Sequence, residues 1–308
     1  MSQVVLQKSK MEIADLKNYY EPFLKGKAPA GSIFSAKTEN CTITAYQSGK
    51  VLFQGKGCEK EAEKWGKAVI TSTPGAAKQT HHLPAKISSL SVAGSDEVGT
   101  GDYFGPITVV AAYVKKEKIA LLRELGVRDS KDLRDEKIIE IAKQLTQIIP
   151  YSLLTLANEK YNQLQQSGMS QAKMKAILHN QAIGHVLQKI APEKPEAILI
   201  DQFAAKDTYY RYLYGQPSIQ REHVYFSTKA ESVHLAVAAA SMIARYAFIR
   251  HMEKLSEEAG FTIPKGAGAQ VDLACADLIR KKGSGCLAHF VKLHFANTEK
   301  AMQLLREK

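Results

Sequence analysis

The sequence predicts a chain of two domains, in which a small α+β domain precedes a layered α/β domain. Three observations lead to this prediction. The chain has 308 residues, whereas single domains commonly contain roughly 100–200. Residues 71–86 hold two prolines and one glycine without a hydrophobic period, which is typical of an exposed linker. Beyond that segment, strand patterns alternate with helical patterns, as they do in layered α/β domains.

Residues 1–70 have the pattern of an α+β domain with an antiparallel sheet. Apolar residues at helical spacing predict helices, and two alternating segments on either side of Ser48–Gly49 indicate a hairpin. We expect helices at Met11–Leu24 and Lys60–Ile70, and strands at Ser32–Lys37, Cys41–Tyr46 and Val51–Gln54.

Residues 87–308 have the pattern of the α/β domain. The β-branched run Ile107–Val114 fits a buried strand, and the alanine-rich segment Glu231–Leu255 fits a long helix. The other expected strands are Leu90–Gly94, Tyr151–Ala157, Ala197–Asp201 and Val224–Phe226, and the other expected helices are Lys116–Leu125, Arg134–Leu145, Lys173–Lys189 and Asp272–Lys282.

The charge of the chain points to a polyanionic partner. Lys and Arg number 42 against 31 Asp and Glu, so the formal net charge is +11. Residues 1–86 alone hold 13 Lys and 7 acidic residues, a net charge of +6. The first domain is therefore the more basic for its length, and it is either a docking platform for a polyanion or a solubilising accessory domain.

Other features exclude several classes of protein. The most apolar stretch, Leu235–Ala244, is about half the roughly 18 residues that a membrane span needs. The N-terminus lacks the apolar core of a signal peptide. The four cysteines contain no C-x-x-C pair, so neither a zinc site nor a disulfide framework is expected. We therefore expect a cytoplasmic protein without a membrane partner.

Carboxylates at three places are the candidate catalytic groups. Asp96 and Glu97 follow an apolar strand and precede Gly99-Thr100-Gly101. Asp201 ends the buried run AILID, where α/β folds place their sites. The third place is Glu231. Each group also has a structural interpretation: Asp96 and Glu97 could lie in a solvated turn, Asp201 could cap the next loop, and Glu231 could complete a Thr-x-x-Glu capping box.

Taken together, these carboxylates predict a metal site. Four converging anions would repel one another, and a divalent cation relieves that repulsion. Oxygen ligands suit Mg²⁺ or Mn²⁺, and two such ions can cleave a phosphodiester. A basic protein with a carboxylate cluster is thus a coherent candidate nuclease.

Four motifs then resemble the type 2 ribonuclease H family, in the order in which that family has them. The resemblance spans about residues 88–290 and implies a ribonuclease H-like catalytic domain with a mixed central sheet and flanking helices. The motifs are GSDEVGTGDYFGPITVVAAYV at Gly94–Val114, RDSKDL at Arg128–Leu133, KAESVHLAVAAASMIAR at Lys229–Arg245 and GFTIPKGAG at Gly260–Gly268.

Within the family, three features resemble the ribonuclease HIII branch. The fourth carboxylate is Glu231, where the HII branch has Asp, and Ala267 stands where the HII branch carries a tyrosine. The extra N-terminal domain is similar to that of ribonuclease HIII, which implies a fold like that of the TATA-box-binding protein.

The resemblance also implies roles for individual residues. Asp96, Glu97, Asp201 and Glu231 would be the catalytic, metal-binding set for two Mg²⁺ or Mn²⁺ ions. The other implied contacts are with substrate: Gly99, Thr100 and Gly101 would lie against the RNA backbone and read its 2′-hydroxyl, and Lys131 and Lys229 would contact phosphates.

The expected function is therefore that of an endoribonuclease. It would hydrolyse the RNA strand of an RNA/DNA hybrid by a two-metal mechanism, leaving 5′-phosphate and 3′-hydroxyl ends, and it would act as a monomer. One alternative is ribonuclease HII-like incision at a single embedded ribonucleotide. The other is a hybrid-binding protein without catalysis, which would leave the carboxylates unexplained.

Overall fold

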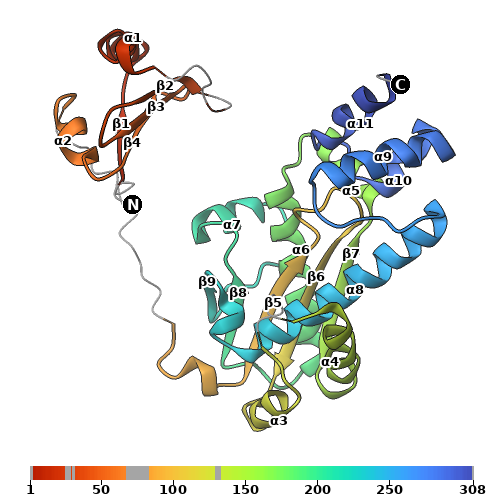
Figure 1. Cartoon of the computed structure of the whole chain (residues 1–308). Helices are drawn as coiled ribbons and strands as arrows, with labels where there is room; N and C mark the ends of the chain where they lie inside the picture. Colours follow the sequence, from red (N-terminus) through yellow and green to blue (C-terminus); the bar gives the residue numbers. More distant parts are fainter. Residues whose placement is uncertain (1–2, 25–28, 30–31, 67–82, 129–132, 307–308) are drawn as a thin grey trace. The chain divides into compact units, whose positions relative to one another are not determined.

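The computed structural model describes residues 3–24, 29, 32–66, 83–128 and 133–306. The chain divides into two compact units, Met1–Thr80 and His81–Lys308 (Figure 1). Most of the predicted linker, residues 71–82, lies outside the described residues.

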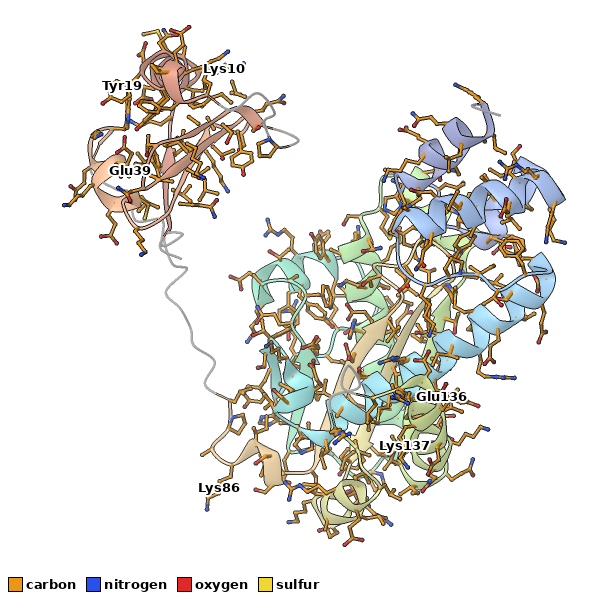
Figure 2. All side chains as sticks on the ribbon, in the orientation of Figure 1. Lys10, Tyr19, Glu39, Lys86, Glu136 and Lys137 are labelled. Carbon is orange, nitrogen blue, oxygen red and sulfur yellow. The ribbon has the colours of Figure 1, made fainter. Side chains whose placement is uncertain are left out.

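The first unit is a four-stranded antiparallel sheet with helices, in the strand order β1-β4-β3-β2. Its apolar core includes Leu16, Tyr20 and Phe53, which are fully buried. On α1, Lys10 and Tyr19 are exposed at the surface (Figure 2). The elements are β1 (Gln3–Gln7), α1 (Lys10–Tyr19), β2 (Ser32–Lys37), β3 (Thr42–Tyr46), β4 (Lys50–Gln54) and α2 (Cys58–Glu63).

Three details of this unit differ from the prediction. The strand β1 was not predicted. Helix α1 ends at Tyr19 and a 3₁₀ turn, Glu21–Phe23, follows, since Pro22 lacks the N–H that would continue the helix. Helix α2 ends at Glu63 rather than continuing to Ile70, and Gly66 follows at φ +133°.

The second unit is built on a five-stranded mixed sheet in the order β7-β6-β5-β8-β9. The pairs β5–β6 and β6–β7 are antiparallel, whereas β5–β8 and β8–β9 are parallel. The strands are β5 (Val92–Val98), β6 (Ile107–Val114), β7 (Tyr151–Leu156), β8 (Ala197–Asp201) and β9 (Val224–Ser227).

Helices cover both faces of this sheet (Figure 1). Val92 and Val110 pack with α4 and α8 on one face, whereas Ala93 and Val109 pack with α6 on the other. The alternation follows from the period of two along a strand. The main helices of this unit are α3 (Ile119–Glu124), α4 (Asp135–Ile148), α5 (Asn158–Gln166), α6 (Gln171–Ile190), α7 (Lys206–Tyr212), α8 (Leu235–Ala259), α9 (Ala269–Lys282), α10 (Leu287–Phe290) and α11 (Asn297–Arg306).

Two boundaries in this unit bear on the site. Strand β5 was expected to end at Gly94 but runs to Val98, because Asp96 and Glu97 stay paired with β6. Helix α8 was expected to begin at Glu231 but begins at Leu235. Glu231 lies instead in a short 3₁₀ turn, Ala230–Ser232, so the capping-box interpretation is wrong.

A separate apolar cluster joins the C-terminal helices to the segment that follows β5. Tyr103 and Phe104 are fully buried there against residues of α8, α9 and α10. This cluster fixes the chain immediately after the Gly99–Gly101 loop. None of the helices in the described part of the chain is both long and apolar enough to cross a membrane.

Candidate active site

The register of two parallel strands brings Asp96 and Asp201 together. Ser95 of β5 is paired with Ile200 of β8, so the next residue on each strand is an aspartate. Asp96 is 8 % exposed, accepts a hydrogen bond from the Glu97 backbone N–H at 2.7 Å, and is hydrogen-bonded to Ser241 of α8. Burial, followed by the charge of Glu97, raises the pKa of Asp96 to about 8, and Asp201 contributes in the same direction.

The turn between β9 and α8 brings Glu231 to the same edge of the sheet. Lys229 has left-handed backbone torsions, with φ +56°, and this reverses the chain. The Ala230 backbone N–H then donates to Asp201 Oδ1 at 2.9 Å, which ties the turn to the end of β8. The Glu231 side chain is 4 % exposed. Three of the four predicted carboxylates therefore lie at the end of the sheet that α8 covers.

Glu97 points to the opposite face of β5, where α6 holds it. Lys175 Nζ lies 2.7 Å from Oε1, and His179 Nε2 lies 2.9 Å from Oε2. The carboxylate can only accept, so His179 Nε2 donates to it, and Ser95 Oγ lies 2.5 Å from Nδ1 of the same ring. Burial raises the pKa of Glu97, but the hydrogen bond and charge of His179, together with Lys175, outweigh burial and lower the pKa to about 2.

Sequence reasoning did not single out Lys175, His179 or Ser95. Lys175 and His179 are one helical turn apart on α6, a spacing visible in the sequence. Only the fold shows that this turn faces Glu97. His234, three residues after Glu231, caps α8 with its ring, whose Nδ1 accepts from the Ala236 N–H at 2.9 Å.

The Gly99–Gly101 loop has the geometry of a backbone contact site. Gly99 has φ +95°, and a Cβ there would lie 2.2 Å from the Pro106 carbonyl oxygen, so only glycine fits. A Cβ at Gly101 would meet nothing within 4 Å, which leaves that side of the loop open. Gln171 Nε2 donates to the Thr100 carbonyl at 3.1 Å and steadies the loop from α6.

Only one of the two lysines that are predicted to contact phosphates lies among the described residues. Lys229 is exposed beside the turn that carries Glu231. Lys131 lies outside the described residues. Asp102, which follows the glycine loop, is not grouped with the carboxylates, since its Oδ1 accepts from the Gly266 N–H at 2.6 Å.

The donor set fits a hard divalent cation. The groups at the end of the sheet are carboxylates, whose oxygens are the ligands that Mg²⁺ and Mn²⁺ prefer. The raised pKa of Asp96 reflects an excess of negative charge in a buried place, which such a cation neutralises. Within the described residues, no three Asp, Glu, His or Cys side chains meet closely enough to form a ready-made metal cage.

A mixed sheet in which two adjacent parallel strands each carry an aspartate, with helices on both faces, defines a domain of the ribonuclease H class. The family model described as "Ribonuclease HII" matches residues 93–298, and one described as "Domain of unknown function (DUF3378)" matches residues 3–78. A relative named "Ribonuclease HIII" from Bacillus cereus (strain ATCC 10987 / NRS 248) is 56% identical and is matched over 99% of each chain. The chain therefore belongs to the type 2 ribonuclease H family, in its ribonuclease HIII branch.

Solved structures agree with this assignment. The crystal structure of Bst-RNase HIII in complex with Mn²⁺ is 48% identical, with a TM-score of 0.71 over 100% of each chain. The Aquifex aeolicus RNase H3 structure is 25% identical, with a TM-score of 0.54 over 94% of this chain and 98% of that one. The predicted fold class and family are confirmed.

Proposed function

We propose that this chain is a metal-dependent endoribonuclease that hydrolyses the RNA strand of RNA/DNA hybrids. The observation that carries the proposal is the register of β5 and β8, which sets Asp96 beside Asp201, next to a glycine loop with an open side. Relatives named ribonuclease HIII and a related structure in complex with Mn²⁺ support it. Water would be added across the phosphodiester, leaving 5′-phosphate and 3′-hydroxyl ends.

Four carboxylates of the chain would hold the metal ions. Asp96, Asp201 and Glu231, with Glu97, would hold two Mg²⁺ or Mn²⁺ ions, which when bound supply charge neutralisation at the attacking water and the leaving 3′ oxygen. The Glu97 carboxylate is bound by Lys175 and His179. To contact an ion, it would have to give up one of these two contacts.

Substrate would be held by the chain itself. The backbone of Gly99, Thr100 and Gly101 would lie against the RNA strand and recognise its 2′-hydroxyl, because the open side of Gly101 admits a close approach. Lys229 is exposed beside Glu231, where it can contact a phosphate. Lys131 would contact a second phosphate. These contacts orient the scissile bond towards the carboxylates.

The decisive experiment is cleavage of a hybrid with a labelled RNA strand, with Mg²⁺, with Mn²⁺ and with excess chelator. We expect cleavage only with metal, and a loss of at least about 100-fold in kcat for Asp96→Asn and for Asp201→Asn, because each removes the charge of a carboxylate that would hold the metal. The matched control is Asp277→Asn, at an exposed i,i+3 ion pair on α9, which should retain activity. Cleavage in chelator, or full activity of Asp201→Asn, contradicts the proposal.

The preferred substrate separates this function from incision at a single embedded ribonucleotide. Ala267 has no hydroxyl to recognise an RNA–DNA junction, and its carbonyl is bound by Asn297 Nδ2 at 3.0 Å. We therefore expect faster cleavage of a continuous hybrid than of a duplex with one ribonucleotide. Binding without any metal-dependent cleavage would support the remaining alternative, a non-catalytic hybrid-binding protein.

Two further properties belong to the same proposal. The enzyme would act as a monomer, since each unit has an apolar core of its own. It would act in the cytoplasm, where the reducing environment suits its four free cysteines.

A further inference from the structure

Lys292 is a buried lysine that the proposed mechanism does not use. Among the described residues it is the only Lys or Arg whose side chain is buried, with 0 % exposure. Lysine is almost never fully buried unless its ammonium is paired, because removing that charge from water is costly. A lysine in this position therefore needs a reason, and its partners supply one.

Both partners of the Lys292 ammonium are backbone carbonyls of one short segment. Nζ donates to the Asp102 carbonyl at 2.7 Å and to the Gly105 carbonyl at 2.5 Å. The ammonium thus spans both ends of residues 102–105, the segment that directly follows the Gly99–Gly101 loop. Nζ also lies over the ring of Tyr161 of α5, 5.9 Å from the ring centroid.

The backbone around Lys292 reinforces this contact. The Lys292 N–H donates to the Tyr103 carbonyl at 2.9 Å, and the Gly105 N–H donates to the Phe290 carbonyl at 3.0 Å. Phe104 and Val291 form an antiparallel bridge between these bonds. Residues 290–292 are therefore bonded to residues 102–105 by backbone hydrogen bonds and by the Lys292 side chain.

The segment that contains Lys292 is in turn held by a side chain of α5. Asn162 Nδ2 donates to the carbonyls of Ala288 and Val291, at 3.1 and 2.8 Å, and Asn162 Oδ1 accepts from the Leu293 N–H at 3.0 Å. Asn162 is 5 % exposed, so these bonds are shielded from water. Residues 288–293 are thus bonded both to α5 and to the segment 102–105 that follows the glycine loop.

We propose that Lys292 is a positioning residue, which fixes residues 102–105 and thereby holds the Gly99–Gly101 loop in the conformation that receives the RNA strand. The proposal rests on the function proposed above, because it assumes that this loop contacts the hybrid. Without the ammonium, two buried carbonyls lose their partner, and the loop gains alternative conformations that compete with binding.

The test compares Lys292→Met, which keeps most of the side-chain volume, with Lys282→Met at an exposed lysine that ends α9. Dissociation constants are measured in excess chelator for an RNA/DNA hybrid and for a DNA duplex of the same sequence. For Lys292→Met we expect hybrid binding about tenfold weaker and duplex binding within about twofold of wild type. With metal, KM should rise about tenfold while kcat stays within about threefold, and Lys282→Met should match wild type throughout.

A second measurement keeps the inference separate from the proposed function. Hydrogen exchange of residues 99–105, measured without substrate, should be about tenfold faster in Lys292→Met than in wild type. If wild type shows no preference for the hybrid, the proposed function fails, while the exchange result still decides the role of Lys292.

Folding is checked by thermal unfolding of each variant. If Lys292→Met does not fold, Asn162→Ala takes its place, since it keeps Lys292 but removes the three bonds that anchor residues 288–293. It should change exchange and hybrid binding in the same direction. A folded variant with wild-type exchange at residues 99–105 and wild-type hybrid binding overturns the proposal.

Discussion

At the scale of single residues, two adjacent carboxylates have opposite acid–base character because the strand turns them to opposite faces. Asp96 has a raised pKa of about 8, caused first by burial and then by neighbouring carboxylates. Glu97 has a lowered pKa of about 2, because His179 and Lys175 outweigh its burial. Environment, rather than residue type, thus assigns different properties to two acids in one strand.

The sequence identified these carboxylates but not their partners. Asp96, Asp201 and Glu231 stand in motifs and at the ends of elements, so they could be found by inspection. Lys175 and His179 lie in an ordinary amphipathic helix, and their role depends on α6 packing across β5. Contacts between residues about 80 positions apart leave no local pattern in the chain.

His234 leads to a prediction about stability and pH. Burial lowers its pKa from the ordinary 6.5 to about 4, while Nδ1 caps α8 and Nε2 contacts the Leu90 carbonyl at 3.1 Å. Between pH 6.5 and 4 the unfolded chain binds a proton that the folded chain refuses, so stability falls as pH falls. This residue should contribute a loss on the order of 3 kcal/mol over that range.

The measurement is chemical denaturation of wild type and of His234→Asn from pH 7 to pH 4. Asparagine can still accept a hydrogen bond at the start of a helix, but it does not titrate. The variant is expected to be less stable at pH 7, because it loses the contact with Leu90, yet to lose less stability on acidification. Equal slopes in the two proteins would show that His234 is not the group responsible.

At the scale of elements, β5 and α8 pack in direct contact beside the carboxylates. A Cβ on Gly94 would lie 2.4 Å from backbone atoms of both Ala236 and Val237, so the strand and the helix touch through their main chains. This close approach places Ser241 of α8 beside Asp96. The sequence predicted both elements but not the end of β5 or the start of α8. Polar residues near the site continue the strand to Val98, and the helix begins only at Leu235.

The two glycines Gly94 and Gly101 should therefore separate stability from binding. Gly94→Ala forces α8 away from β5, and we expect it to lower the free energy of unfolding by about 2 kcal/mol or more. Gly101→Ala meets no atom within 4 Å, so stability should change by less than about 0.5 kcal/mol. Its methyl group would, however, occupy the space that the RNA backbone needs.

These expectations are checked by denaturant unfolding and by hybrid binding in chelator. Gly101→Ala should weaken hybrid binding about tenfold, whereas the folded fraction of Gly94→Ala should bind close to wild type. If Gly101→Ala binds the hybrid normally, the open side of the loop is not where the RNA strand lies.

At the scale of the whole molecule, catalysis and affinity are expected to reside in different units. The candidate site lies entirely in the unit His81–Lys308, whereas residues 1–86 carry a net charge of +6 out of +11. Alternating strands and the position of the linker indicated two domains in advance. The mixed character of the sheet followed only from the family resemblance. The strand order β7-β6-β5-β8-β9 was not predicted, because it depends on long-range pairing that hydrophobic patterns do not encode.

Removal of residues 1–85 tests this division of labour. The remaining unit keeps its own apolar cores and its carboxylates, so it should fold and retain kcat within about threefold at saturating hybrid. Lysines of the first unit would contact phosphates, and each lost contact reduces the magnitude of the negative slope of log K against log salt by about 0.9. We therefore expect weaker binding at 0.1 M salt and a shallower salt dependence. Unchanged binding with the same slope would mean that the basic first unit does not dock the hybrid, and that its charge serves solubility instead.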